Sequence, residues 1–405
     1  MRYFEIIESI QTKFDAKKLL RKISDLKTLQ KIDNIFRKEG YEIRLVGGAV
    51  RDLILGRTPK DLDLATTAMP ENSIDILKRR GIKVIETGLQ HGTITAVIDG
   101  EEYEITTLRI DRETDGRHAD VEWTRDWKKD AERRDLTFNA MSLDLDGTLY
   151  DYYGGVEDLK NNQPIFVGNP DARIKEDYLR ILRYFRFQGR MDKPQWHDET
   201  LDAIKSNASG LKQISGERIW MEMQKIMQGN HASEILDVMH QLNIDQYIDV
   251  DLSKVHGEFD RVNNLKLNSR DLLLAALLRN EQDVKRVNDR WKLSSETRDL
   301  VKFIVNHRDQ TFDRDVSMYM WTNNKIKDQH VYMLALYLGK KDLAQMIKNT
   351  TKPEFPVAGQ DLIDLGYKPG PELGKILKAM QQAWKESDYT MDKQTLLKGI
   401  TNESI

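Results

Sequence analysis

Apolar and polar positions follow two different patterns along this chain, and the change of pattern divides it. Residues 5–39 carry apolar side chains at the spacing of a helix that buries one face. From residue 41 to about 158, strand-like alternation replaces that spacing, and the predicted strands, with two helices between them, are 42–47, 61–66, 82–86, 92–98, 102–108 and 141–153. Beyond about residue 160, amphipathic stretches predict helices at 172–189, 198–228, 232–247, 269–279, 295–307, 328–348 and 371–386. The sequence therefore predicts an α/β head followed by an all-α remainder.

Composition excludes several classes of protein and site. The chain has 63 Lys and Arg against 66 Asp and Glu, a net charge of −3, so any surface for nucleic acid must be a local patch. It contains no cysteine, which excludes disulfides, thiolate zinc sites and cysteine nucleophiles. No apolar run reaches the length of a membrane span, and the N-terminal residues lack the apolar core of a signal peptide. We expect a protein of a soluble interior compartment.

The segment 45–67, LVGGAVRDLILGRTPKDLDLATT, carries the strongest chemical signal. Gly47 and Gly48 close an apolar strand and open a helix with Arg51, an arrangement that binds phosphate through free backbone N–H groups. Asp61 and Asp63 follow two residues apart, so on a strand they share one face and can hold Mg²⁺. Each half alone is weak, but together they are typical of nucleotidyl transfer.

Further candidates lie on either side of residue 120. Alternation in EEYEIT (101–106) makes Glu104 the candidate third carboxylate of the metal cluster, although a solvated strand face fits the pattern equally well. The segment RRDLTFNA (133–140) includes Arg134 and can clamp a triphosphate, because arginine makes two-pronged phosphate contacts. Without further context, a surface basic pair is the commoner interpretation.

The segment KEDYLRILRYFRFQ (175–188) carries a possible base-reading pair. On a helix Asp177 and Arg180 are neighbours, and Arg183 and Arg186 continue the same stripe. The carboxylate accepts a hydrogen bond from the amino group of C or A, and the guanidinium beside it donates to the ring; G and U instead present an oxygen to the carboxylate. The alternative is an exposed ion pair on a basic helix face. The aromatic side chains Tyr178, Tyr184, Phe185 and Phe187 are more typical of a helical core than of a base-stacking platform.

Taken in order, these motifs resemble the class II tRNA nucleotidyltransferases, the CCA-adding enzymes of the DNA polymerase β superfamily, in the branch of mitochondria and many bacteria. The matching segments are GGAVRD (47–52), DLD (61–63), TDGRHADVEW (114–123), RRDLTFNA (133–140), EDYLRILRYFRF (176–187), ISGERIWMEMQKIM (214–227) and FPVAGQDLIDLG with PGPELG (355–374). The resemblance covers nearly the whole chain and is weakest in residues 1–38 and 245–345.

The resemblance implies a polymerase β-like head followed by a helical neck, body and tail. We accordingly expect a head at 1–160 with N-terminal helices, a neck at 161–230, a body at 231–310 and a tRNA-binding tail at 311–405. It also implies roles for single residues. Asp61 and Asp63 match the metal ligands, Gly48 and Arg51 match triphosphate contacts, and Arg134 matches a nucleotide-binding arginine. Asp177 and Arg180 match the amino-acid template for the base, and Arg183 and Arg186 match arginines that support the nucleotide.

The implied activity is Mg²⁺-dependent addition of C, C and A to tRNA 3′ ends from CTP and ATP. Nearby alternatives are a poly(A) polymerase and an enzyme that adds only A or only CC, although CC-adding relatives typically lack the TDGRHADVEW loop. A non-catalytic RNA-binding protein is a more remote one. We further predict that the polar loop 111–125 is mobile and re-aims the template when C addition gives way to A addition. The expected location is cytoplasmic, or mitochondrial in a eukaryote, with no membrane and no obligate protein partner.

Overall fold

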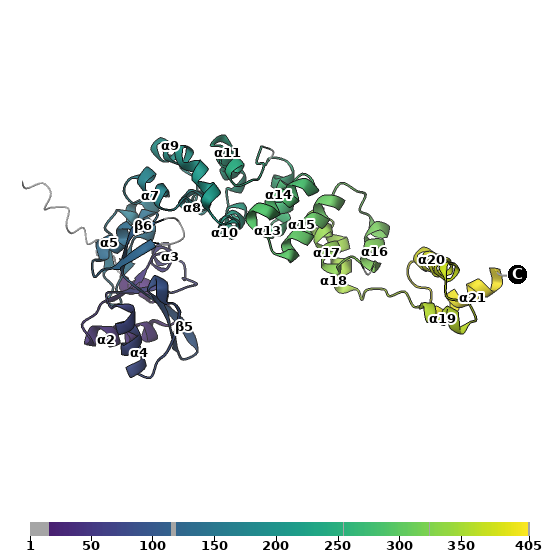
Figure 1. Ribbon diagram of the computed structural model, residues 1–405, viewed down its shortest axis with the longest axis horizontal. Helices are drawn as coiled ribbons and strands as arrows, with labels where there is room; N and C mark the ends of the chain where they lie inside the picture. The colour runs from purple at the N-terminus through teal and green to yellow at the C-terminus, as the bar shows by residue number, and fades with distance from the viewer. Residues whose placement is uncertain (1–15, 115–118, 254, 324, 404–405) are drawn as a thin grey trace, which may run out of the picture. The chain divides into compact units, whose positions relative to one another are not determined.

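A computed structural model describes residues 16–114, 119–253, 255–323 and 325–403. The chain divides into two compact units, one of Met1–Asp260 with Lys285–Leu293 and one of Arg261–Val284 with Ser294–Ile405. The first unit contains all the strands of the described residues and the helices that follow them (Figure 1). This two-part division does not test the four expected domains, whose boundaries stay a prediction.

A seven-stranded mixed sheet organises the head. Its order is β3-β4-β5-β2-β1-β8-β9, and only β2 and β5 pair in parallel among the described strands. The strands are β1 Ile43–Val46, β2 Leu64–Thr66, β3 Lys83–Gly88, β4 Thr93–Ile98, β5 Glu101–Thr107, β8 Ser142–Leu143 and β9 Leu149–Tyr150. Asp99 and Gly100 join β4 to β5 with positive φ angles of 55° and 88°, as the predicted hairpin requires.

Helices of the head pack against this sheet (Figure 1). In α2, Leu26–Lys38, the buried side chains Leu29, Ile32 and Phe36 recur at helical spacing, as the pattern of 5–39 predicts. A break at 21–25 separates α2 from α1, Ala16–Leu20, and the rest of the predicted segment lies outside the described residues. The remaining head helices are α3 Gly48–Ile54, α4 Pro70–Arg79 and α5 Trp127–Glu132.

The rest of the first unit is a helical core. Its helices are α6 Gly155–Lys160, α7 Pro170–Glu176, α8 Leu179–Gln188, α9 Asp198–Asn207, α10 Gly216–Met227 and α11 Ala232–Gln241. Tyr184, Phe185 and Phe187 of α8 are buried there, and the Tyr184 ring stacks on Phe166 at 5.7 Å between centroids. The predicted core role of these three aromatic residues is confirmed.

Two predicted helices of this region are interrupted. The segment 172–189 breaks at Asp177, whose backbone is extended (φ −154°, ψ 103°) and whose carboxylate accepts the Leu179 N–H at 3.1 Å. Such a local bond to a backbone N–H competes with continuation of the helix. The segment 198–228 is interrupted by the 3-10 turn Ala208–Gln213 between α9 and α10.

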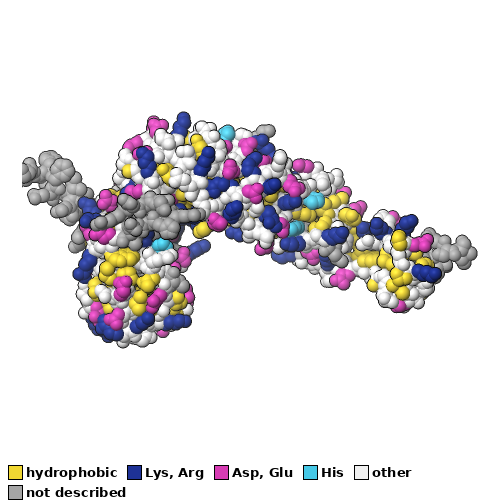
Figure 2. All heavy atoms as spheres, viewed as in Figure 1, with side chains coloured by type: hydrophobic (Ala, Val, Ile, Leu, Met, Phe, Trp, Pro, Cys, Tyr) yellow, Lys and Arg dark blue, Asp and Glu magenta, His cyan; other side chains and the backbone are white. Residues whose placement is uncertain are grey.

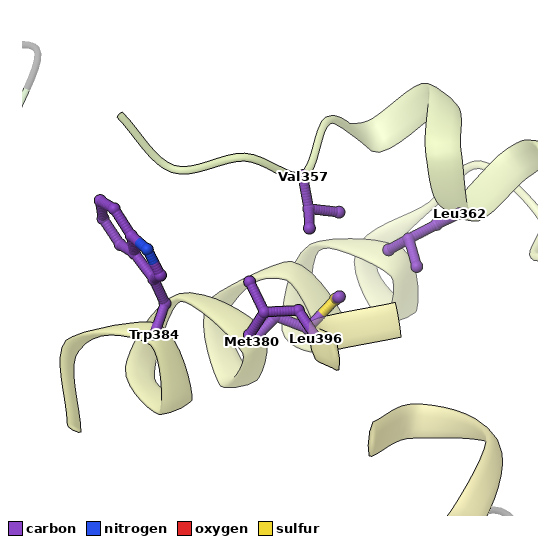
Figure 3. Packing of buried hydrophobic residues seen from close by; sticks show 5 residues of the cluster. All are labelled: Val357, Leu362, Met380, Trp384 and Leu396. Carbon is purple, nitrogen blue, oxygen red and sulfur yellow. The ribbon is translucent and has the colours of Figure 1, made fainter. Parts of the chain in front are cut away.

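Every strand or helix assigned to the described residues of the second unit is a helix: α13 Arg270–Leu277, α15 Ser295–His307, α16 Arg314–Thr322, α17 Asp328–Tyr337, α18 Lys341–Asn349, α19 Gly359–Asp364, α20 Pro371–Glu386 and α21 Lys393–Glu403. The residues of α12 Glu258–Asn264 and α14 Glu281–Trp291 are divided between the two units, after Asp260 and after Val284 respectively. The predicted helix 328–348 ends early because Gly339 adopts φ +71°, the usual helix-stop conformation. Figure 3 shows the small C-terminal core, in which Val357, Leu362, Met380, Trp384 and Leu396 meet.

Surface charge is mixed, as the near-zero balance predicts. Lys and Arg side chains are interspersed with Asp and Glu over the face shown in Figure 2. A strongly basic site must therefore be local.

Within the described residues, no helix is both long and apolar enough to cross a membrane.

Candidate active site

One cleft of the first unit gathers most of the predicted site residues. It has a volume of about 690 Å³, and nine arginines line it against five carboxylates. The charged lining consists of Arg51, Asp61, Asp63, Arg109, Arg133, Arg134, Asp135, Glu176, Asp177, Arg180, Arg183, Arg186, Arg190 and Arg218. An excess of fixed guanidinium groups suits a polyanion such as a nucleoside triphosphate.

The glycine turn forms one wall of the cleft. Gly47 has φ +62°, and a Cβ there would lie 3.0 Å from Nη1 of Arg134, so glycine is required both for the backbone and for the close approach. Gly48 begins α3, which carries the buried Arg51. The structure therefore brings Gly47, Gly48, Arg51 and Arg134 together, as the sequence predicts.

Asp61 and Asp63 both line the cleft, although the predicted strand that carries them is wrong at its start. β2 begins only at Leu64, and the two aspartates lie in the non-strand segment before it. The Asp63 carbonyl accepts the Val46 N–H at 3.0 Å, which ties this segment to the end of β1. Leu64 is buried, whereas Leu62 is only half-buried.

The negative charges of the Asp61 and Asp63 carboxylates repel one another. Desolvation within the cleft, and then the Asp61 carboxylate, raise the pKa of the Asp63 carboxyl above its usual value, while Arg134 lowers it. A bound cation would relieve this repulsion. Among the described residues, no group of three or more His, Cys, Asp or Glu is placed to hold a metal ion.

Glu104 is the least supported member of the predicted metal cluster. It is exposed on β5 and is not among the residues that line the cleft. The parallel register pairs Leu64 with Ile105, so Glu104 lies level with Asp63 on the neighbouring strand. Its role stays a prediction.

A chain of buried hydrogen bonds crosses from α3 to α8 through the RRDLTFNA segment. Arg51 Nη1 donates to Asn139 Oδ1 at 2.8 Å, and Asn139 Nδ2 donates to Asp135 Oδ1 at 3.0 Å. The other oxygen of Asp135 accepts from Arg183 Nε at 2.7 Å and Nη2 at 2.6 Å. Burial alone would raise the pKa of Asp135, but the Arg183 charge and these hydrogen bonds outweigh it and lower that pKa to about 2.

Arg134 is held from behind by a second buried carboxylate. Its Nη2 lies 3.3 Å from Asp130 Oδ2, and Arg133 Nε donates to Asp130 Oδ1 at 2.8 Å. Burial opposes ionisation of Asp130, yet the two arginines outweigh it and keep its pKa below the usual value. The adjacent arginines therefore form a fixed wall rather than the alternative of a surface basic pair.

Asp177 and Arg180 both face the cleft, but not as neighbours on one helix. Asp177 lies in the break between α7 and α8, and its Oδ2 accepts from Arg218 Nη2 at 2.7 Å. Arg180 Nη1 donates to Glu176 Oε2 at 2.6 Å, and its Nη2 donates to the Arg133 carbonyl at 2.8 Å. The expected helical ion pair is thus replaced by two separate pairs.

Arg186 lies deeper than Arg183. It is buried, its Nη1 lies 3.0 Å from Glu222, and its guanidinium lies 4.4 Å from the centroid of the Phe187 ring. Burial lowers the pKa of Arg186 to about 10. Arg186 therefore forms part of the buried floor of the cleft.

The lining residues without a predicted role include His91, Arg109, Arg190 and Arg218. Arg190 continues the arginine stripe of α8 by one further turn, a signal that the spacing contained. Arg218 lies within the quoted motif ISGERIWMEMQKIM, but its distance along the chain hid its contact with Asp177. His91 and Arg109 carried no local signal.

The predicted loop 111–125 is largely a two-stranded ribbon. β6, Arg109–Thr114, pairs antiparallel with β7, Ala119–Trp123, and residues 115–118 lie outside the described residues. The Trp123 ring fills the space beside Gly92, where a Cβ would lie 2.4 Å from it. The expected loop is wrong for the strand residues, because charged side chains hide the period-two alternation by which a strand is usually recognised; the mobility and the gating role of the segment stay predictions.

Comparisons with known proteins identify the family of this chain. Residues 43–164 match the family model of the poly A polymerase head domain, and residues 196–249 match that of a probable RNA and SrmB binding site of polymerase A. The CCA tRNA nucleotidyltransferase 1, mitochondrial, of Danio rerio is 45% identical over 91% of this chain and 89% of its own length. The CCA-adding enzyme of Lactococcus lactis subsp. cremoris (strain MG1363) is 33% identical over 89% of this chain and 92% of its own length.

Structural similarity extends over the same length. The crystal structure of the Bacillus stearothermophilus CCA-adding enzyme in complex with CTP covers 90% of this chain and 94% of its own, with a TM-score of 0.71 and 29% identity. The mixed-sheet head followed by helices matches that fold. The chain therefore belongs to the CCA-adding enzymes, the CCA tRNA nucleotidyltransferases.

Proposed function

We propose that this enzyme adds C, C and A in turn to the 3′ end of tRNA, taking CTP and ATP and releasing pyrophosphate, in a two-metal reaction with the base selected by Asp177 and Arg180. The observation that carries the proposal is the single arginine-rich cleft that holds Asp61 and Asp63 together with Asp177 and Arg180. Metal-binding carboxylates and a base-reading edge within one cleft are what this transfer needs.

Asp61 and Asp63 are the proposed ligands of the metal, and Mg²⁺ is the proposed ion, because two carboxylates are a hard oxygen donor set. When bound, it would supply Lewis-acid activation of the tRNA 3′-OH and charge stabilisation for the leaving pyrophosphate. Burial and the neighbouring Asp61 carboxylate raise the pKa of Asp63, and a bound cation would offset both effects by stabilising the ionised carboxylates. Glu104 is kept as a candidate third carboxylate.

The arginines and the glycine turn would bind the triphosphate. Gly47 and Gly48 let the backbone come close, while Arg51 and Arg134 present guanidinium groups whose positions are set by buried partners. Fixed donors lose little conformational entropy on binding, which favours positioning of the reacting phosphate.

Base choice would rest on one acceptor and one donor. The Asp177 carboxylate would accept the amino group of C or A, and the donors of Arg180 left over from its own bonds would reach the ring. U and G present an oxygen where C and A present an amino group, so they meet the carboxylate with repulsion. Arg183 and Arg186 would hold the wall behind the nucleotide.

The second substrate is tRNA, through its acceptor arm. The match of residues 196–249 to an RNA-binding family model supports contacts from α9 to α11. No obligate protein partner is proposed. The compartment is proposed as cytoplasmic, with mitochondria as the alternative that the name of the zebrafish relative favours.

The decisive experiment incubates the protein with a tRNA lacking CCA and with each nucleoside triphosphate, separately and together, in Mg²⁺. We expect two residues added with CTP alone and three with CTP and ATP, read as product length on denaturing gels. Long tails from ATP alone would instead indicate a poly(A) polymerase, and a stop after CC or no C addition would indicate a partial enzyme. No addition under any condition would leave the RNA-binding alternative.

A further inference from the structure

Two side chains on one face of α10 form hydrogen bonds to two residues of the α7–α8 segment. Arg218 and Glu222 lie four residues apart on α10, about one helical turn, and so share a face. Arg218 Nη2 donates to Asp177 Oδ2 at 2.7 Å, and Glu222 accepts from Arg186 Nη1 at 3.0 Å. A helix that contributes little to the wall of the cleft thus fixes side chains that do.

Asp177 depends on this help more than Arg180 does. Arg180 is held by Glu176, four residues away, and by two backbone carbonyls. Asp177 stands in an extended break between helices, where its own segment supplies one bond, from the Leu179 N–H to Oδ1. The orientation of Oδ2 is set by Arg218, and that oxygen keeps a second lone pair for a base.

The Arg218–Asp177 pair also lies where a nucleotide in the cleft can contact it. Both residues line the cleft, and their side chains are 33% and 24% exposed. The pair is accessible to a ligand, and solvent screens its hydrogen bond only in part, because both side chains are more than half buried.

We propose that Arg218 is a positioning residue for base selection, which fixes the Asp177 carboxylate in the orientation that accepts the amino group of C or A. This inference rests on the proposed role of Asp177. Without Arg218 the carboxylate can rotate away, so the repulsion against the oxygen of U is relieved while the favourable contact with C weakens. Loss of Arg218 therefore costs discrimination, whereas an arginine that only bound phosphate would affect CTP and UTP equally.

The test measures kcat/KM for CTP and for UTP on a tRNA that lacks CCA. Arg218→Met removes the donors and keeps the length, and Arg218→Lys keeps the charge but replaces the planar guanidinium with a flexible ammonium group. We expect the CTP-over-UTP ratio to fall about tenfold in Arg218→Met, the loss that follows from about 1.4 kcal/mol of discrimination, with partial recovery in Arg218→Lys. Arg79→Met is the matched control, because Arg79 also pairs with carboxylates but lies on α4 outside the cleft; its ratio should stay at the wild-type value.

A double substitution separates action through Asp177 from direct action. If Arg218 works through Asp177, adding Arg218→Met to Asp177→Ala changes the ratio no further. An unchanged ratio in Arg218→Met, or an equal loss for both nucleotides in Arg218→Met and Arg218→Lys, overturns the inference and leaves the role of Asp177 standing. A normal ratio in Asp177→Ala itself would instead overturn the proposed role of Asp177, and the inference with it.

Discussion

Replacing Asp135 with asparagine should loosen the junction between the glycine turn and α8. Asp135 is buried and bonds to Arg183, Asn139 and the Leu136 N–H. Asparagine keeps the volume and one acceptor, but it turns an amide NH₂ toward the Arg183 guanidinium and removes the charge that balances it.

The expected cost follows from the pKa of Asp135. Its fall from 3.8 to about 2 corresponds to roughly 2 kcal/mol, at about 1.36 kcal/mol for each unit. Breaking a fully buried ion pair costs more, but the Arg183 side chain is 33% exposed, so solvent screens part of the loss. We therefore expect about 2 kcal/mol, equivalent to a roughly 30-fold rise in the equilibrium for local opening.

Amide hydrogen exchange measures that opening directly. The backbone N–H groups of residues 136–140 and of α8 should exchange roughly 30-fold faster in Asp135→Asn than in the wild type. Asp75→Asn is the control, because Asp75 forms an exposed pair with Arg79, and its loss should change exchange by less than about fivefold.

The effect should also depend on pH with a definite sign. The folded-state pKa of Asp135 is depressed, so its stabilisation is present above about pH 4 and is lost as the pH falls through about 2. The ratio of the exchange rates of Asp135→Asn and the wild type should therefore be smaller at pH 3 than at pH 5. Exchange rates within threefold of one another at pH 7 would refute the reasoning.

Three further predictions concern the site. Asp61→Ala and Asp63→Ala should each reduce C and A addition by at least about a thousandfold, because stabilisation of transition-state charge is lost. The affinity for tRNA, measured by gel shift, should stay near the wild-type value. Near-normal turnover in either variant would exclude the pair as metal ligands. Asp177→Ala should lower the use of CTP and ATP and weaken the rejection of UTP and GTP by about 1–3 kcal/mol, whereas Arg180→Ala should lower the use of both CTP and ATP. Competition assays with mixed triphosphates measure these preferences. A full preference for CTP over UTP in Asp177→Ala would contradict the prediction. Scrambling residues 113–122 should spare CC addition and selectively cripple the terminal A, read as product length with CTP alone and with both nucleotides; completion of CCA at the normal rate would reduce the ribbon to a connector.

The sequence by itself determined the elements that depend on neighbouring residues. Helical spacing of apolar residues predicted α2, α15 and α20, and the Asp99-Gly100 turn predicted the β4–β5 hairpin. The glycine pair, the two aspartates and the arginine stripe were visible because their chemistry is confined to short segments. Such features need no knowledge of distant contacts, since backbone conformation and side-chain spacing specify them locally.

Tertiary structure decided which of these segments meet and what each side chain contacts. The helix expected at 172–189 breaks at Asp177, because a local bond to the Leu179 N–H and a distant one to Arg218 outweigh helical continuity. His91 and Arg109 joined the cleft without any local signal. A contact such as Arg218 with Asp177 spans 41 residues of sequence, and its energy depends on how α10 packs against α8. Periodicity records which face of a helix is buried, but only packing determines the partner that buries it.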